Sequence, residues 1–144
     1  MRFAIVALGA LFLTAGKAPT ARAAEEVTYE VKTGPAKGAV GAKGTIGVTI
    51  AARPGWHVNE EAPLTLKLVP EAGIAVDKAK LTRADLAQTT KEMARFDVAF
   101  TPSEAGHKTI NCEASFVMCQ ATTCMPVKEK IALAVDVTAA RKKR

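Results

Sequence analysis

The sequence has few aromatic residues, few cysteines and no long hydrophobic run after its N-terminal stretch. Of 144 residues, 5% are aromatic, three are cysteine and two are histidine. Ten glycines and seven prolines are ordinary frequencies, which excludes collagen-like and linker-like chains. The sequence contains no Cys-x-x-Cys pair, no His-Glu-x-x-His run and no recognisable Ser-His-Asp set. With 49% hydrophobic and 24% charged residues, it is typical of one modest globular domain.

The positive charge of the chain is concentrated at its two ends. The formal net charge is +6, but residues 1–23 hold three basic side chains and no acidic one, and residues 141–144 hold four more basic side chains. The body between these ends is therefore close to neutral. A nucleic-acid-binding surface needs clustered positive charge, so no nucleic-acid partner is expected.

The N-terminus has the pattern of a secretory signal peptide. A short positive start at Met1-Arg2 is followed by 11 apolar residues from Phe3 to Leu13 and by a small-x-small site at Ala21-Arg22-Ala23. A membrane anchor is the alternative, but a spanning helix needs about 20 apolar residues, and Gly16-Lys17 interrupts this stretch. The sequence therefore predicts a signal peptide at residues 1–23, a domain at residues 24–138 and a basic tail at residues 139–144.

Export has consequences for location and for cysteine chemistry. The mature chain is expected to be a periplasmic monomer that does not insert into a membrane, because no later segment approaches transmembrane length. Disulfide bonds are permitted in that compartment.

Hydrophobic residues alternate with polar or small residues along five stretches of the mature chain. This period of two is typical of strands with one buried face, and turn signals rich in glycine and proline separate the stretches. The pattern predicts an all-β fold, an immunoglobulin-like antiparallel β-sandwich. The predicted inward-facing residues are Ile46, Val48 and Ile50; Leu64, Leu66 and Leu68; Phe96, Val98 and Phe100; Ile110, Cys112, Ala114 and Phe116; and Ile131, Leu133, Val135 and Val137.

Two segments depart from simple alternation. Thr82 and Asp85 have the spacing of a capping box, so the stretch from Leu81 to Gln88 is predicted as either one helical turn or a strand. The glycine-rich stretch from Gly34 to Gly44 lacks the Gly-Lys-Ser/Thr ending of a phosphate-binding loop and is predicted as a mobile connection before a strand.

The three cysteines fall into two classes. Cys112 shares the apolar parity of its strand, so it is expected to be a buried thiol with a raised pKa and little reactivity. Cys119 and Cys124 bracket a four-residue turn between two predicted strands. Residues that face each other across such a turn can have Cα atoms about 5.5 Å apart, within the range for a disulfide.

The spacing of this pair leaves two roles open. A disulfide closing a six-residue loop stabilises a fold by only about 2 kcal/mol in the chain-entropy model. An exposed turn also gives an incoming thiolate access to a sulfur, as exchange requires. Many secreted β-domains nevertheless carry a small hairpin disulfide without a redox role. On spacing alone, a working pair and a structural bond are equally supported.

The residues around the two cysteines resemble a known family, and this resemblance favours a working redox pair over a structural bond. The segment from Phe116 to Pro126, followed by the alternating strand from Lys130 to Val137, resembles the cysteine-bearing hairpin of the N-terminal domain of DsbD, the bacterial inner-membrane thiol:disulfide interchange protein. The segment from Pro54 to Asn59 is also similar to that family. The resemblance covers about residues 25–138, and its specific part is the cysteine hairpin.

The resemblance implies a function and a partner. It implies that Cys119 and Cys124 cycle between dithiol and disulfide and exchange electrons with a membrane thiol reductase or a thioredoxin-fold oxidoreductase. No cofactor is implied. The chain departs from the family at Met125, where an aromatic residue is common, at Val127, where a second proline is usual, and in having no carboxylate between the cysteines.

Two further hypotheses assign the chain to other functional classes, a copper-binding protein and a non-catalytic binding module. Met118-Cys119 and Cys124-Met125 bring two thiols and two thioethers into one connection, and soft sulfur ligands select Cu(I), with His57 and His107 as possible nitrogen ligands. The other hypothesis is a binding module with a purely structural disulfide, in which His57 beside Trp56 lines a small pocket.

Overall fold

The computed structural model describes residues 27–142, and these residues form an almost entirely β structure. Its one helical element is a 3-10 turn, η1, at Arg83–Asp85. The eleven strands are β1 (Tyr29–Thr33), β2 (Ala36–Ala39), β3 (Gly44–Ala52), β4 (His57–Val58), β5 (Thr65–Pro70), β6 (Ile74–Val76), β7 (Lys80–Thr82), β8 (Leu86–Thr89), β9 (Met93–Pro102), β10 (Gly106–Cys119) and β11 (Cys124–Thr138).

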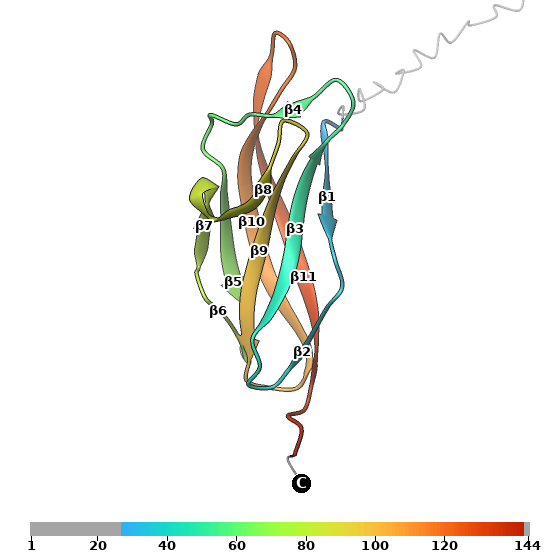
Figure 1. Ribbon diagram of the computed structural model, residues 1–144, viewed down its shortest axis with the longest axis vertical. Helices are drawn as coiled ribbons and strands as arrows, with labels where there is room; N and C mark the ends of the chain where they lie inside the picture. Colours follow the sequence, from blue (N-terminus) through green and yellow to red (C-terminus); the bar gives the residue numbers. More distant parts are fainter. Residues whose placement is uncertain (1–26, 143–144) are drawn as a thin grey trace, which may run out of the picture.

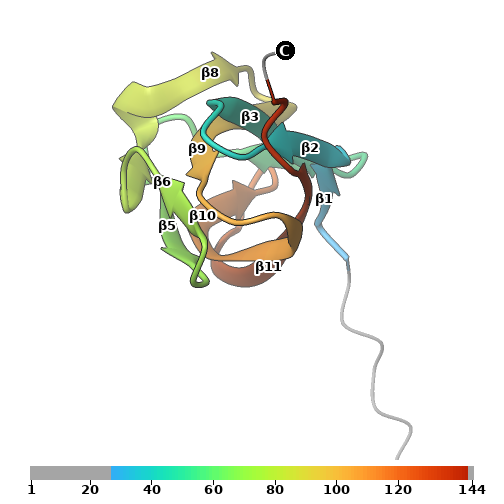
Figure 2. The ribbon, with the colours of Figure 1, turned by 90° about the horizontal axis from the view of Figure 1, so that it is seen from below.

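The strands form two sheets that pack face to face. One sheet has the order β1-β3-β9-β6, with β8 also paired to β9, and the other has the order β2-β11-β10-β5-β7, with β4 also paired to β10. Figure 2 shows the two layers almost end-on, with β3 and β9 on one side of the core and β10 and β11 on the other. The prediction of an immunoglobulin-like antiparallel β-sandwich is confirmed.

The core follows the period-two pattern of the sequence. Alternate residues of β3, β9, β10 and β11 are buried between the sheets, because successive side chains of a strand point to opposite faces. Of the predicted inward-facing residues, only Ile131 is partly rather than fully buried. The largest completely buried side chains include Phe96, Phe100, Leu64, Leu66, Ile110 and Leu133.

The glycine-rich stretch from Gly34 to Gly44 contains a strand that the sequence pattern did not predict. Instead of being only a connection, it contains β2, which pairs in parallel with the last residues of β11. This pairing joins residues about 100 positions apart, so local composition did not reveal it. Gly44 also has a packing role, since a Cβ atom there would lie 2.6 Å from the ring of Phe100.

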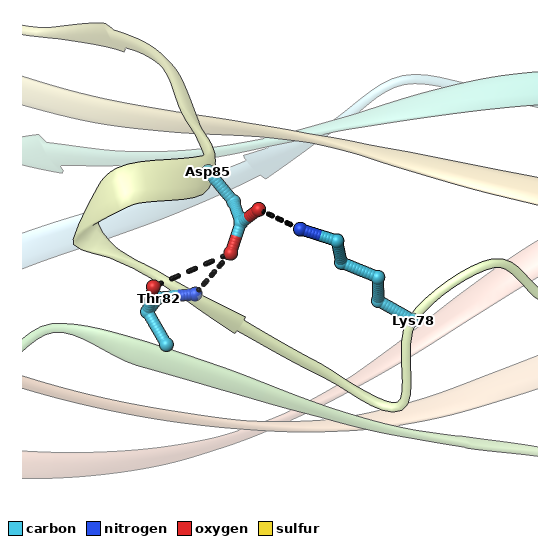
Figure 3. Close-up of polar contacts among 3 residues, drawn as sticks. All are labelled: Lys78, Thr82 and Asp85. Carbon is cyan, nitrogen blue, oxygen red and sulfur yellow. Dashed lines mark hydrogen bonds and ion pairs between the residues drawn. The ribbon is translucent and has the colours of Figure 1, made fainter.

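The segment after β7 combines both predicted alternatives. β7 ends at Thr82, η1 forms a single turn, and β8 follows. Asp85 Oδ2 accepts hydrogen bonds from the Thr82 backbone N–H at 2.9 Å and from the Thr82 hydroxyl at 3.3 Å, and Lys78 pairs with the other carboxylate oxygen (Figure 3). The Lys78 hydrogen bond, followed by the Thr82 backbone bond, lowers the pKa of Asp85. These contacts fix the turn that carries Arg83.

The predicted signal peptide and the predicted basic tail lie at the two ends of the chain. The signal peptide predicted at residues 1–23 lies outside the described residues. In the part of the predicted basic tail that is described, residues 139–142 are exposed and lie beyond the last strand. Among residues 27–142, no helix has the length and apolar character needed to cross a membrane.

Candidate functional site

The Cys119–Cys124 pair lies at the tip of the longest hairpin of the fold. β10 and β11 pair without interruption from Gly106–Val137 to Cys119–Cys124, and their tip lies at the opposite end of the molecule from the last residues of β11 (Figure 1). The two cysteines form a disulfide bond with a Cα–Cα distance of 4.0 Å. The predicted disulfide is therefore confirmed.

The hydrogen-bond pattern of the turn explains why these two Cα atoms are so close. The Gln120 N–H donates to the Thr123 carbonyl at 2.7 Å, so residues 120 and 123 form the last hydrogen-bonded pair. The neighbouring pair, Cys119 with Cys124, is then of the non-hydrogen-bonded type. In antiparallel sheets this type brings facing Cα atoms closer together than the hydrogen-bonded type does.

The two methionines beside the cysteines lie on the other face of the hairpin. Met118 pairs with Met125 and Cys119 pairs with Cys124, and directly opposed residues share a face while successive residues alternate. Met118 is completely buried in the core beside Val58 of β4. The register therefore places the two methionine side chains on the opposite face of the hairpin from the two cysteine side chains.

The two bonded cysteines differ strongly in exposure. Cys119 is only 2% exposed, because β11 lies on one side of it and β4, paired through His57, lies on the other. Cys124 is exposed, as are the turn residues Ala121 to Thr123 before it. Cys124 is therefore the more accessible residue of the bonded pair.

Asn59, directly after β4, contacts the buried sulfur. Its Nδ2 atom donates to Cys119 Sγ at 3.5 Å. Its backbone N–H donates to the Val117 carbonyl at 2.9 Å, which ties the residue to β10. Nothing in the sequence pattern links Asn59 to a cysteine 60 positions away, so sequence reasoning identified it only as part of a similar segment.

A surface hollow of about 390 Å³ lies beside the disulfide. Both cysteines line it together with polar and charged residues from three parts of the chain, and these are His57, Asn59, Glu60, Glu61, Lys91 and Gln120. Glu60, Glu61 and Lys91 are exposed and were not among the residues predicted for the site. The turn between the cysteines has no carboxylate, but the fold supplies two carboxylates to the same hollow.

Cys112 has a different environment from the bonded pair, as predicted. It is a free thiol, 5% exposed, in the middle of β10. Its Sγ atom has a weak contact with the Ile110 carbonyl at 3.6 Å. Burial raises the pKa of the Cys112 thiol to about 12, so it has almost no thiolate at neutral pH.

The two histidines are far apart. His57 lines the hollow at the tip, whereas His107 lies near the start of β10, where its Nδ1 atom is 2.6 Å from Asp136 Oδ1. The fold does not bring them into one ligand set. Among residues 27–142, no group of three or more His, Cys, Asp or Glu side chains is placed to hold a metal ion.

Comparisons with known proteins identify the fold. No family model and no curated protein sequence matches the chain. The chain is similar to the seventh ScaB type I cohesin from Pseudobacteroides cellulosolvens, at 12% identity, with a TM-score of 0.53 and coverage of 81% of this chain and 96% of the cohesin. It is also similar to AggA, the major subunit of aggregative adherence fimbriae type I from Escherichia coli, at 11% identity, with a TM-score of 0.41 and coverage of 76% and 94%. At this identity the cohesin likeness shows the fold alone.

Proposed function

We propose that this protein is a periplasmic thiol–disulfide exchange protein in which Cys119 and Cys124 cycle between disulfide and dithiol. The observation that carries the proposal is the disulfide at an exposed hairpin tip, between one buried and one exposed cysteine, on the wall of a polar hollow. A bond of this kind is open to attack at one sulfur. The resemblance of the hairpin to the N-terminal domain of DsbD supports the same role.

The exposure difference gives the two cysteines different roles. A partner thiolate attacks the sulfur of the exposed Cys124, the S–S bond breaks, and its electron pair leaves on Cys119 Sγ as a thiolate. The product is a mixed disulfide between the partner and Cys124. A second partner thiolate then attacks the partner's own sulfur in that bond and releases Cys124. Two electrons and two protons have then passed from the partner dithiol to this pair, and the reverse sequence returns them.

The partner is proposed to be a thioredoxin-fold oxidoreductase or a membrane thiol reductase. The sequence contains no Cys-x-x-Cys motif, so the second dithiol of each exchange is assigned to a partner. The periplasmic location depends on the signal-like pattern of residues 1–23 and on the oxidising compartment that a persistent disulfide requires.

Two single substitutions test this assignment. In the reverse direction, Cys119→Ala leaves Cys124 able to attack the disulfide of an oxidised partner but removes the Cys119 thiolate that would resolve the mixed disulfide, whereas Cys124→Ala leaves only the buried cysteine. We expect Cys119→Ala to trap a thioredoxin-fold partner from a periplasmic extract and Cys124→Ala to trap much less. The measurement is a non-reducing gel on which dithiothreitol abolishes the additional band.

Other outcomes would support other functions. If neither variant traps a partner and the parent disulfide resists thioredoxin-fold reductants, the bond is a structural staple and the exchange function is wrong. Titration of the reduced protein with Cu(I) against a competing chelator tests the copper hypothesis. A tight one-to-one complex that is lost when Met118 and Met125 are replaced would favour copper binding over exchange.

A further inference from the structure

The side chain of Asn59 is held in one orientation by contacts at both of its polar ends. Its Oδ1 atom accepts hydrogen bonds from the backbone N–H groups of Glu61 at 2.9 Å and Ala62 at 3.0 Å. Its Nδ2 atom is thereby directed to Cys119 Sγ, 3.5 Å away. Because the oxygen has two N–H donors, the amide cannot rotate to present its oxygen to the sulfur without losing both bonds.

The loop that carries Asn59 is itself clamped from a distant element. The Arg83 guanidinium donates to the Asn59 carbonyl at 2.8 Å and to the Ala62 carbonyl at 2.6 Å. Arg83 lies on η1, which the Asp85 contacts of Figure 3 hold in place. The amide donor is therefore positioned before any reaction at the disulfide begins.

We propose that Asn59 is a positioning residue that stabilises the thiolate released on Cys119 and so makes Cys119 the leaving sulfur and Cys124 the attacked one. This inference rests on the proposed exchange function. A disulfide sulfur is a weak hydrogen-bond acceptor, whereas a thiolate carries a full negative charge. The Nδ2 bond therefore becomes stronger as the S–S bond breaks, which lowers the barrier to cleavage in that direction.

The other charged or titratable side chains near Cys119 Sγ line the hollow beside the disulfide. Glu60 and Glu61 follow Asn59 in the same loop, His57 lies opposite Cys119 on β4, and Lys91 comes from the segment between β8 and β9. The variants compared below keep all four groups, so differences between variants report on the side chain at position 59.

The test compares Asn59→Asp with Asn111→Asp in a Cys124→Ala background. Asp at position 59 keeps the Oδ1 acceptor for the loop but replaces the donor with an anionic oxygen. Asn111 is an exposed residue eight positions from Cys119 on the same strand and does not line the hollow, so Asn111→Asp controls for the change in net charge alone. The pKa of the Cys119 thiol is measured from its ultraviolet thiolate absorbance. Cys112 does not interfere, because its pKa of about 12 keeps it protonated in the titration range.

We expect Asn59→Asp to raise the pKa of Cys119 and Asn111→Asp to leave it unchanged, because only the first removes a donor to the thiolate and places a negative charge beside it. Asn59→Ala, which removes the donor without adding charge, should give a smaller rise. This second variant also covers the case in which the Asp variant does not fold. A Cys119 pKa in Asn59→Ala equal to that of the parent would overturn the inference, even if Asn59→Asp raised the pKa, because the added charge alone would then explain that rise.

A kinetic measurement connects this contact to exchange. In the two-cysteine protein, reduction of the disulfide by dithiothreitol should be about threefold slower in Asn59→Asp than in Asn111→Asp at the same pH, because a thiol of higher pKa leaves more slowly. Equal rates would show that Asn59 does not assist cleavage. If the pKa shift and the slower rate are found but no partner protein exchanges with the pair, the proposed function is wrong while the role of Asn59 at the sulfur stands.

Discussion

Cys112 and Cys119 lie seven positions apart on the same strand, and both are almost completely buried, yet they are suited to different chemistry. Cys112 points into the hydrophobic core, and burial raises its pKa to about 12. Cys119 lies on the opposite face, is bonded to the exposed Cys124 and contacts the Asn59 amide. Low exposure alone therefore does not decide whether a cysteine of this strand is a free thiol or part of a disulfide. The face of the strand and the neighbours of the sulfur decide it.

The largest expected effect is on thiol alkylation in the reduced, folded protein. Cys124 should react first with iodoacetamide and Cys112 last, since a pKa about three units above the usual value reduces the thiolate population about a thousandfold. Mass spectrometry of timed samples identifies the labelled peptides. Labelling of Cys112 before Cys124, without denaturant, would contradict the assignment of Cys112 to the inert core.

The next largest effect is expected on removal of the Cys119–Cys124 disulfide. Replacing Cys119 and Cys124 together by alanine should abolish exchange while lowering the free energy of unfolding by only about 2 kcal/mol, because the bond closes a loop of six residues. Guanidinium unfolding of the oxidised parent and the double variant measures this difference. A loss of 5 kcal/mol or more would mean that the fold depends on the bond, which would favour a structural staple.

A smaller effect is expected at the core cysteine. Cys112→Ala should lower the free energy of unfolding by about 1 kcal/mol, through loss of packed sulfur, and should leave exchange unchanged. The same unfolding series and a partner-reduction assay measure both quantities. Loss of exchange in this variant, with the fold retained, would show that Cys112 takes part in the chemistry.

The smallest expected effect is on the stability of the fold at alkaline pH. The pKa of Cys112 is raised from 9.0 to about 12 by burial, and that of Tyr29 is raised from 10.0 to about 12 by burial and its hydrogen bond to Glu129. Both groups lose their protons at a lower pH in the unfolded chain than in the folded protein. The stability that they contribute is therefore complete below their unfolded pKa values and is lost as the pH rises toward 12. The parent should therefore lose more stability than Cys112→Ala between neutral pH and pH near 11. Equal losses would contradict the burial of a protonated Cys112.

Local sequence pattern predicted the fold because alternation is a local property. The parity of β3, β9, β10 and β11 identified their buried faces, and parity alone placed Cys112 inside. The disulfide also followed from a local signal, two cysteines on either side of a short turn. These features depend on residues within one strand or one hairpin.

The surroundings of the disulfide could not be predicted in this way. Asn59 reaches Cys119 only because β4 pairs with the end of β10, and Lys91 reaches the hollow only because the segment between β8 and β9 lies beside β4. The Val58 N–H donates to the Lys91 carbonyl at 2.8 Å, a contact between residues 33 positions apart. Such contacts depend on which strands become neighbours, and a single sequence carries no local signal for that choice.

The reduction potential of the Cys119–Cys124 pair tests the central claim most directly. Equilibrating the mature protein with glutathione or dithiothreitol buffers and measuring the oxidised fraction by alkylation and mass spectrometry gives this value. The exchange function predicts a potential of about −120 to −270 mV, the range of thiol–disulfide exchange proteins. A potential below about −300 mV, typical of structural disulfides, would contradict it.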